Sequence, residues 1–442
     1  MKKGILLFLL FVAVFPSFGQ DAFDFADGSK KVSIPFKFIN NLLFIPIKVN
    51  GIELNFLLDS GVEETILFSL EDKKEVNFFN IEKITLRGLG SSEAIEGLKS
   101  TNNILETHGL KSVNHVLYVV LDQDFNLSSH VGIPVNGIIG YNFLKNNLVE
   151  INYAKKKIII YKNKESIKAK IEQKFKKIPI TIERSKPYVM TNITLENTDM
   201  PAKLLIDIGN SDALWLFQNL SKSIKIPTKN FVDYLGQGFS GEVMGKKARA
   251  SKFSISDFEF KNPVIAFPDS SSIKNVKMVP GRIGSIGGEI LKRFTLIFDY
   301  SDKFLYLKKN NQYNTPFAYN KSGIEVQHYG LQWVQETVKL QNVPSDSKEV
   351  DAGGIKVMND FRYKFQLKPV YQISNLRENS AAANSGLKKG DIIISINKVK
   401  GYKYTLEQIN SLLKEEEEKW ITFEIERESK ILKFKFQLLN VL

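Results

Sequence analysis

Two segments of this chain, 148 residues apart, carry the same pattern of an acid, one residue and a glycine after an apolar run. In NFLLDSGVEETILF, Asp59 and Gly61 follow three apolar residues, and in AKLLIDIGNSDALWLF, Asp207 and Gly209 do the same. An acid that follows an apolar strand is unusual enough to need a reason, since carboxylates are seldom buried without a partner. Because this pattern occurs twice at a fixed distance, we interpret it as part of an internal duplication.

Glycines outside the two segments support the duplication. A shift of 147 or 148 residues relates five pairs of them: Gly88 and Gly236, Gly90 and Gly238, Gly97 and Gly245, Gly137 and Gly284, and Gly140 and Gly287. Glycine permits tight turns and close backbone contacts that a side chain would block. Five such pairs in nearly one register, together with an acid pair, indicate two structurally equivalent units.

Each unit has the hydrophobic pattern of short β-strands rather than of helices. The segment from Ile34 to Asp59 alternates apolar runs with turn residues, and Asn50-Gly51 is a strong hairpin signal. Two equivalent units related by an approximate two-fold axis would bring their Asp-x-Gly loops together. The sequence therefore predicts a mainly β fold in which Asp59 faces Asp207.

Asp59 has two interpretations. Aspartate is common in turns because it tolerates unusual backbone angles, and this reading is stronger for Asp207, since Ile208 interrupts the motif there. The repetition of the acid favours a functional pair instead. Two carboxyl groups at hydrogen-bond distance cannot both ionise readily, so they share a proton, and such a pair can act as general base and general acid.

The first 310 residues resemble the aspartic peptidases of the retropepsin and pepsin type, with both halves in one chain. The resemblance covers about residues 30–309 and is carried by Leu57-Leu58-Asp59-Ser60-Gly61 and by Ile138-Ile139-Gly140, which is matched less well by Ser285-Ile286-Gly287. It implies two barrel-like β lobes, a water-mediated attack on a peptide bond by the Asp59/Asp207 dyad, protein or peptide substrates, and no cofactor or metal. It also implies active-loop support from Ser60, Gly61, Ile208 and Gly209, and flap hairpins with candidate residues Gly88, Gly90, Ser91, Ser92, Gly236, Gly238 and Phe239.

The second loop departs from this family's motif, which has a hydroxyl residue where Ile208 stands. In the family, each hydroxyl bonds to the backbone of the opposite loop. We expect Ser60 to bond the Ile208 N–H and the Ile206 carbonyl, whereas the reciprocal bonds have lost their side chain. The alternative function is therefore a catalytically impaired protein of the same fold that binds peptides or acts as a scaffold.

The C-terminal region has a different pattern and resembles a PDZ domain, an α+β fold. The resemblance lies in SAAANSGLKKGDIIISIN, where a short helix over 381–385 precedes a glycine-containing turn and an apolar strand, and in a later helix, TLEQINSLLKEEE. PDZ domains bind peptides by strand addition beside a helix, although packing on the peptidase is an equally open role. The candidate groove residues are Tyr363, Phe365, Leu367 and Ile409.

The N-terminus predicts export. Lys2-Lys3 precede an apolar run that ends near Ser17 and Gly19, which is typical of a cleaved signal peptide; a retained membrane anchor is the alternative. The chain has no cysteine, its four histidines lack metal-ligand spacing, and its net charge of +13 is spread over lysine-rich segments. We therefore predict a periplasmic or secreted protein without metal, nucleic acid or a stable membrane span. The predicted organisation is a signal peptide (1–19), lobe 1 (20–168), lobe 2 (169–310), a linker (311–320) and a PDZ-like domain (321–442).

Overall fold

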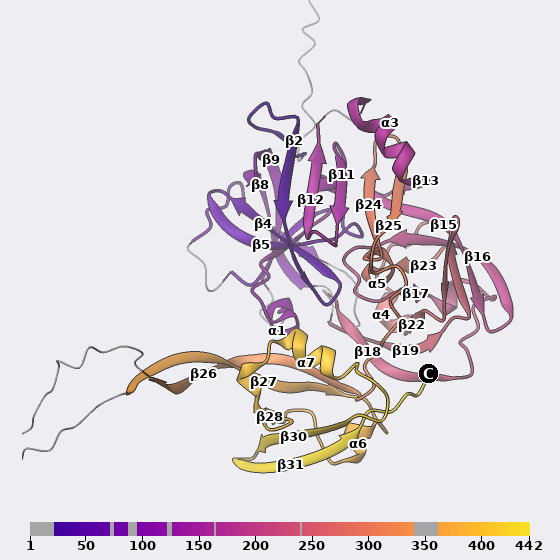
Figure 1. Ribbon diagram of the computed structural model, residues 1–442. Coiled ribbons are helices and arrows are strands. Elements are labelled where there is room, and N and C mark those ends of the chain that lie inside the picture. The colour runs from indigo at the N-terminus through magenta and orange to yellow at the C-terminus, as the bar shows by residue number, and fades with distance from the viewer. Residues whose placement is uncertain are drawn as a thin grey trace, which may run out of the picture.

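The computed structural model describes residues 22–70, 75–86, 95–121, 126–162, 165–238, 241–339 and 361–442. The predicted signal peptide lies outside these residues. The fold is mainly β, with 52% strand and 12% helix, as the sequence predicts. The described strands form four sheets, of which two belong to the duplicated units, one joins the units, and one belongs to the C-terminal domain (Figure 1).

The first unit is built on one mixed sheet with the order β1-β9-β6-β10-β5-β4-β8-β7, in which β3 pairs with β4. The predicted hairpin is present: Asn50 and Gly51 have positive φ angles of 49° and 90°, as a two-residue turn between twisted strands requires. The strands are β1 (Asp24–Phe25), β3 (Lys37–Ile39), β4 (Leu42–Val49), β5 (Ile52–Leu58), β6 (Thr65–Leu67), β7 (Glu82–Leu86), β8 (Ile95–Thr107), β9 (Leu110–Val120) and β10 (Gly137–Ile139). Two short helices follow its strands, α1 (Leu127–Val131) and α2 (Tyr141–Leu144).

The second unit repeats this plan in a sheet with the order β18-β19-β22-β17-β23-β16-β15-β20-β21, in which β14 pairs with β15. Its strands are β14 (Thr181–Glu183), β15 (Lys186–Leu195), β16 (Thr198–Ile206), β17 (Leu214–Leu216), β18 (Asn230–Gly238), β19 (Gly241–Arg249), β20 (Lys252–Ile255), β21 (Phe258–Lys261), β22 (Val264–Pro268) and β23 (Arg282–Ile286). Its helical turns are η1 (Gln218–Leu220), α4 (Ser270–Ile273) and α5 (Gly288–Leu291). The parallel pair β16–β23 is the counterpart of the parallel pair β5–β10.

A third sheet joins the two units and reveals their symmetry. Its order is β13-β25-β24-β11-β12-β2, with β2 (Lys31–Pro35), β11 (Leu148–Asn152), β12 (Lys157–Tyr161), β13 (Lys176–Pro179), β24 (Phe294–Asp299) and β25 (Phe304–Lys309). Helix α3 (Glu165–Lys174) connects the units on its outer side (Figure 1). In the central antiparallel pair, Glu150 lies opposite Ile297, its own equivalent under the 147-residue shift. A two-fold axis therefore passes through this pair, and one hydrophobic core runs through both units.

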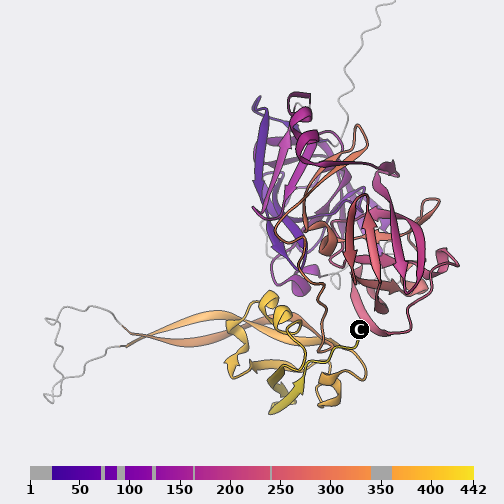
Figure 2. The ribbon, with the colours of Figure 1, turned by 45° about the vertical axis from the view of Figure 1, so that its right-hand side comes forward.

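The C-terminal domain forms the sheet β26-β27-β28-β30-β31, with β29 paired to β28, and has a separate core. Its elements are β26 (Ile324–Lys339), β27 (Phe361–Leu376), α6 (Ala381–Asn384), β28 (Ile392–Ile396), β29 (Val399–Lys400), η2 (Gly401–Lys403), α7 (Leu406–Leu412), β30 (Trp420–Arg427) and β31 (Lys430–Gln437). The predicted helices are present as α6 and α7, and Thr405 and Gln408 form a capping box at the start of α7. The far halves of β26 and β27 project from the domain as a two-stranded arm (Figure 2).

Candidate active site

Asp59 and Asp207 occupy equivalent places in the two units. Each acid directly follows a central strand, β5 or β16, and its backbone N–H extends the parallel pairing: Asp59 donates to the Ile139 carbonyl at 2.8 Å and Asp207 to the Ile286 carbonyl at 2.9 Å. The strand paired in parallel with each of these, β10 or β23, is followed by a glycine, Gly140 or Gly287, that lets the loops pack closely. A Cβ on Gly140 would lie 2.1 Å from the Asp59 carbonyl oxygen, so only glycine fits there.

The two Asp-x-Gly loops have the same internal hydrogen bonds. The Gly61 N–H donates to Asp59 Oδ1 at 2.7 Å, and the Gly209 N–H donates to Asp207 Oδ1 at 3.2 Å. Each bond holds one carboxyl oxygen against its own loop and leaves the other oxygen available. The carboxyl groups are therefore oriented by backbone amides, which do not titrate.

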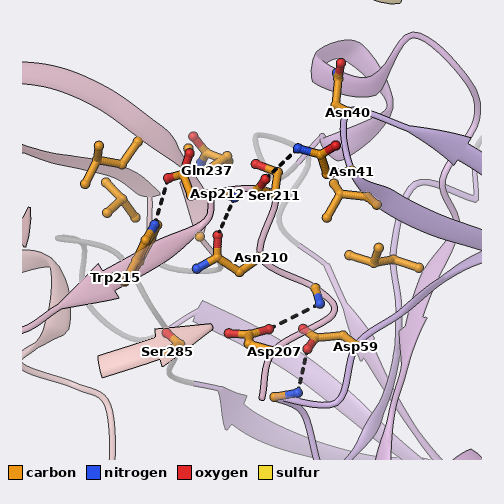
Figure 3. Close-up of a pocket in the computed structure, with 18 of the residues that line it drawn as sticks. Asn40, Asn41, Asp59, Asp207, Asn210, Ser211, Asp212, Trp215, Gln237 and Ser285 are labelled. Carbon is orange, nitrogen blue, oxygen red and sulfur yellow. Dashed lines mark hydrogen bonds between the residues drawn. The ribbon is translucent and has the colours of Figure 1, made fainter. Parts of the chain in front are cut away.

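The loops meet so that the two carboxyl groups face each other at the floor of a cavity (Figure 3). The side chains lie close enough for each carboxyl group to perturb the pKa of the other. A Cβ on Gly209 would lie 2.2 Å from Asp59 Cγ, and one on Gly61 would lie 3.2 Å from Asp207 Oδ1. The structure thus brings the predicted pair together and packs each acid against the glycine of the opposite loop.

The surroundings of the pair favour the protonated state. Burial raises the pKa of both carboxyl groups. At Asp207, burial together with the nearby charge of Asp59 raises the pKa to about 8, although the cations Arg282 and Lys186 oppose the rise. Near neutral pH the pair can therefore present one proton donor and one proton acceptor, which is the combination that activates a water and polarises a carbonyl.

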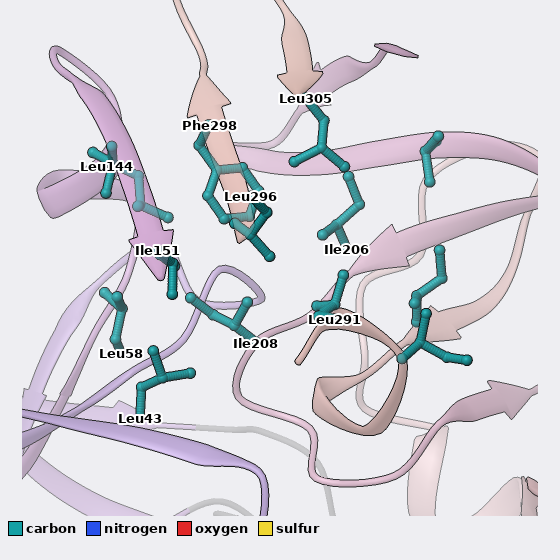
Figure 4. Packing of buried hydrophobic residues seen from close by; sticks show 14 of the residues in the cluster. Leu43, Leu58, Leu144, Ile151, Ile206, Ile208, Leu291, Leu296, Phe298 and Leu305 are labelled. Carbon is teal, nitrogen blue, oxygen red and sulfur yellow. The ribbon is translucent and has the colours of Figure 1, made fainter. Parts of the chain in front are cut away.

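Ser60 links the two loops as the sequence predicts. Its hydroxyl is fully buried, donates to the Ile206 carbonyl at 2.6 Å and accepts from the Ile208 N–H at 3.0 Å. Ile208, in the equivalent position, is also fully buried, and Figure 4 shows it between Leu58, Ile151 and Leu291. The link between the loops is therefore polar on one side and apolar on the other.

A second contact between the units lies beside the acids. The Asn41 side chain donates to the Ser211 carbonyl and to Glu289, both at 2.9 Å, and accepts from Lys292 at 3.0 Å (Figure 3). The sequence analysis did not single out Asn41. Its signal was weak, because asparagine in a turn is common and its partners are about 170 and 250 residues away in the chain.

The cavity has a volume of about 1370 Å³ and is large enough for several residues of an extended peptide. Both units line it, and so does the C-terminal domain through Glu325 and Val326 of β26 and through Asn410 and Lys414 at α7. Of the flap candidates, Gly236 and Gly238 line the cavity at the end of β18, and Gly236 has a φ of 145°. The remaining candidates, Gly88, Gly90, Ser91, Ser92 and Phe239, lie outside the described residues.

The residues predicted for the peptide groove of the C-terminal domain lie in two different places. Phe365 and Leu367 lie on the projecting arm, opposite Gln335 and Trp333, and are 60% and 48% exposed, whereas Ile409 is fully buried in the domain core. Tyr363 is on the same arm, and its side chain is outside the described part of the chain. The edge of the sheet is β26 rather than β27, and α7 packs beside β26. The edge strand β26 also packs against α1 of the first unit, and Glu325 and Val326 of β26 line the cavity of the acid pair.

Comparison with known proteins identifies the C-terminal part. A family model of the PDZ domain matches residues 349–426, which include α6, β28 and α7. The C-terminal domain is a PDZ domain. PDZ domains are peptide-binding modules, so the match implies peptide ligands, and no curated protein matches the chain. Among the described residues, no helix is both long and apolar enough to cross a membrane, and no group of three or more His, Asp or Glu residues is placed to hold a metal ion.

Proposed function

We propose that this protein is an exported aspartic endopeptidase of the retropepsin and pepsin type. The observation that carries the proposal is the approach of Asp59 and Asp207, two acids on equivalent loops that each pack against the glycine of the opposite loop in a large cavity. The two-fold register of the joining sheet and the Ser60 link between the loops add support. Export is proposed from the N-terminal sequence alone.

In the proposed reaction, the ionised carboxyl takes a proton from a water molecule held between the two acids. The protonated carboxyl donates a hydrogen bond to the oxygen of the scissile carbonyl, and the water oxygen attacks the carbon to form a tetrahedral intermediate. Proton transfer to the leaving nitrogen then breaks the carbon–nitrogen bond and releases a carboxylic acid and an amine. The Gly61 and Gly209 amides hold the carboxyl groups in place during these transfers.

Replacement of the acids tests the proposal. Asp59→Asn and Asp207→Asn should each reduce the cleavage of an unfolded protein such as casein by at least about a hundredfold, because each removes one half of the proton-transfer system. Glu64→Gln is the control, since Glu64 is an exposed carboxylate that lines the same cavity. The parent protein should also show a bell-shaped dependence of rate on pH, with two apparent pKa values that belong to the pair. Equal rates for the parent and Asp59→Asn would refute the proposal.

A second function is favoured by Ile208 and by the PDZ match. Ile208 provides no hydroxyl for the Ser60 N–H, so the second loop lacks half of the family's link between the loops. In this case the protein would bind extended peptides in the same cavity without cleaving them. Binding of a peptide to the parent protein, with no hydrolysis between pH 3 and pH 9, would identify this function.

A further inference from the structure

The duplication allows the cavity walls of the two units to be compared position by position, and one position differs in charge. The shift of 147 residues that relates Gly137 to Gly284 also relates Val135 to Arg282. Both residues lie just before or at the start of equivalent strands, β10 and β23, and both are buried. The first unit has an apolar side chain at this place, and the second unit has a cation.

The wall of the first unit has an apolar patch at this place. A cluster of buried side chains surrounds the position of Val135, and it comprises Phe44, Leu57, Ile66, Phe68, Val120, Val131 and Ile138. Five of its members line the cavity directly: Phe44, Leu57, Ile66, Val131 and Ile138. This wall suits an apolar side chain of a ligand, because burial of apolar surface is the main gain available there.

In the second unit, the Arg282 guanidinium lies in the wall of the cavity between two aromatic rings. Its Cζ atom is 6.0 Å from the centre of the Tyr188 ring and 5.2 Å from that of Phe217, and its Nε donates to the Gly284 carbonyl at 3.1 Å. The residue is only 7% exposed and lines the cavity. The rings and the carbonyl fix the orientation of the guanidinium, and none of these uncharged neighbours balances its positive charge.

Among the residues that the structure describes, no carboxylate forms an ion pair with Arg282. Glu183, an acid of the same unit, is paired with Lys203 at 2.7 Å. Asp207 interacts with Arg282 electrostatically, but burial and the charge of Asp59 raise the pKa of Asp207, which makes it a weaker anionic partner than an ordinary carboxylate. A buried arginine is normally paired with an anion, and the planar guanidinium is suited to bind a carboxylate through two hydrogen bonds.

A second cation lies on the same wall. Lys186 begins β15, lines the cavity, and interacts electrostatically with both acids of the pair. Its equivalent region in the first unit has no cation at the cavity, where Asn41 and Leu42 are found instead. Of the two duplicated units, only the second therefore places lysine or arginine side chains on the described wall of the cavity.

We propose that Arg282, assisted by Lys186, forms a subsite for a substrate carboxylate, so that the preferred peptide carries Asp or Glu on one side of the scissile bond. The apolar wall of the first unit then receives an apolar side chain on the other side of the bond. This inference rests on the proposed peptidase function and specifies the substrate class of that site: acidic, extended peptides.

The test compares two peptides that differ only by Glu or Gln at the position next to the cleaved bond. Cleavage products of an unfolded protein mixture, identified by mass spectrometry, should show Asp or Glu enriched at that position. The parent protein should have a kcat/KM about 10- to 100-fold higher for the Glu peptide than for its Gln counterpart, which is the range for one well-placed charged hydrogen-bonded pair. Arg282→Met should bring this ratio close to one, Arg282→Lys should retain part of it, and Lys186→Met should lower it.

Lys203→Met is the matched control, because Lys203 is a cation of the same unit that does not line the cavity; its ratio should equal that of the parent. Thermal unfolding shows whether Arg282→Met folds, and Lys186→Met carries the test if it does not. A Glu/Gln ratio near one in the parent, or an unchanged ratio in Arg282→Met, would overturn the subsite while leaving Asp59-dependent cleavage intact. If the parent cleaves neither peptide nor any unfolded protein, the peptidase proposal fails, and the subsite is tested by calorimetric binding of the two peptides to the parent. Equal affinities for the Glu and Gln peptides would then overturn the carboxylate subsite.

Discussion

The hydroxyl of Ser60 makes two hydrogen bonds to the backbone of the opposite loop, so its removal should be measurable. Ser60→Ala deletes one oxygen atom from a fully buried site and changes little else. The Ile208 N–H then loses its acceptor, and the Ile206 carbonyl loses a donor at 2.6 Å. A buried donor without a partner costs about 1–3 kcal/mol, and the lost hydroxyl bond adds about 1 kcal/mol. We expect a total decrease of about 2–4 kcal/mol in the free energy of unfolding.

Urea unfolding followed by tryptophan fluorescence is a suitable assay. Trp215 is buried in the second unit, whereas Trp333 and Trp420 are 70% and 53% exposed, so the fluorescence change reports mainly on the duplicated part of the chain. Ser254→Ala is the control, since Ser254 is only partly buried in β20 and no hydrogen bond of its hydroxyl is found; it should change stability by less than about 0.5 kcal/mol. If Ser60→Ala is as stable as this control, the hydroxyl does not hold the units together and the reasoning is refuted.

Three further outcomes follow from the structure. Because the pKa of Asp207 is raised to about 8 from 3.8, the native state keeps a proton that the unfolded chain releases, so stability should fall as pH rises from about 4 to about 8. Asp207→Asn should flatten this part of a curve of unfolding free energy against pH. An unchanged slope would contradict the assignment of the raised pKa to Asp207. Gly209→Ala should displace the opposing carboxyl and abolish peptidase activity, because its Cβ would lie 2.2 Å from a carboxyl carbon, whereas Gly330→Ala, with open space around it, should retain activity. In the PDZ domain, Arg427→Met leaves the carboxylate of Asp391, which is 1% exposed, without its paired guanidinium. This change should lower the free energy of unfolding of that domain by about 3 kcal/mol, measured by thermal or urea unfolding. A loss below about 0.5 kcal/mol would show that the ion pair contributes nothing to stability.

The sequence was most informative where a pattern is repeated or local. The duplication of Asp59 at Asp207 predicted which side chains meet, because equivalent loops in a two-fold arrangement must approach each other. The Asn50-Gly51 hairpin and the helices α6 and α7 were predictable from turn and capping residues that act within a few positions. The bonds of Ser60 followed from the same repeat.

Features that depend on the pairing of distant strands were not predictable in this way. The peptide groove was assigned to the strand of Phe365 because the edge of a sheet is decided by which strands find partners, and β27 is covered by β28 whereas β26 is not. The carboxylate subsite proposed at Arg282 was not predicted either, because a single basic residue in a lysine-rich chain carries no local signal. Its comparison with Val135 under the 147-residue shift was available in the sequence and would have revealed the difference.

The pairing of β11 with β24 has a consequence for any half of this molecule produced by itself. Glu150 lies opposite its counterpart Ile297 in this antiparallel pair. Two copies of β11 could therefore pair with each other in the same register, because their backbones offer the same donors and acceptors. A fragment that ends after β12 would expose this ladder of amides and carbonyls and should associate as a homodimer with the same register. The covalent connection through α3 makes that association intramolecular, and it frees each half to acquire side chains that a symmetric dimer would be forced to carry twice.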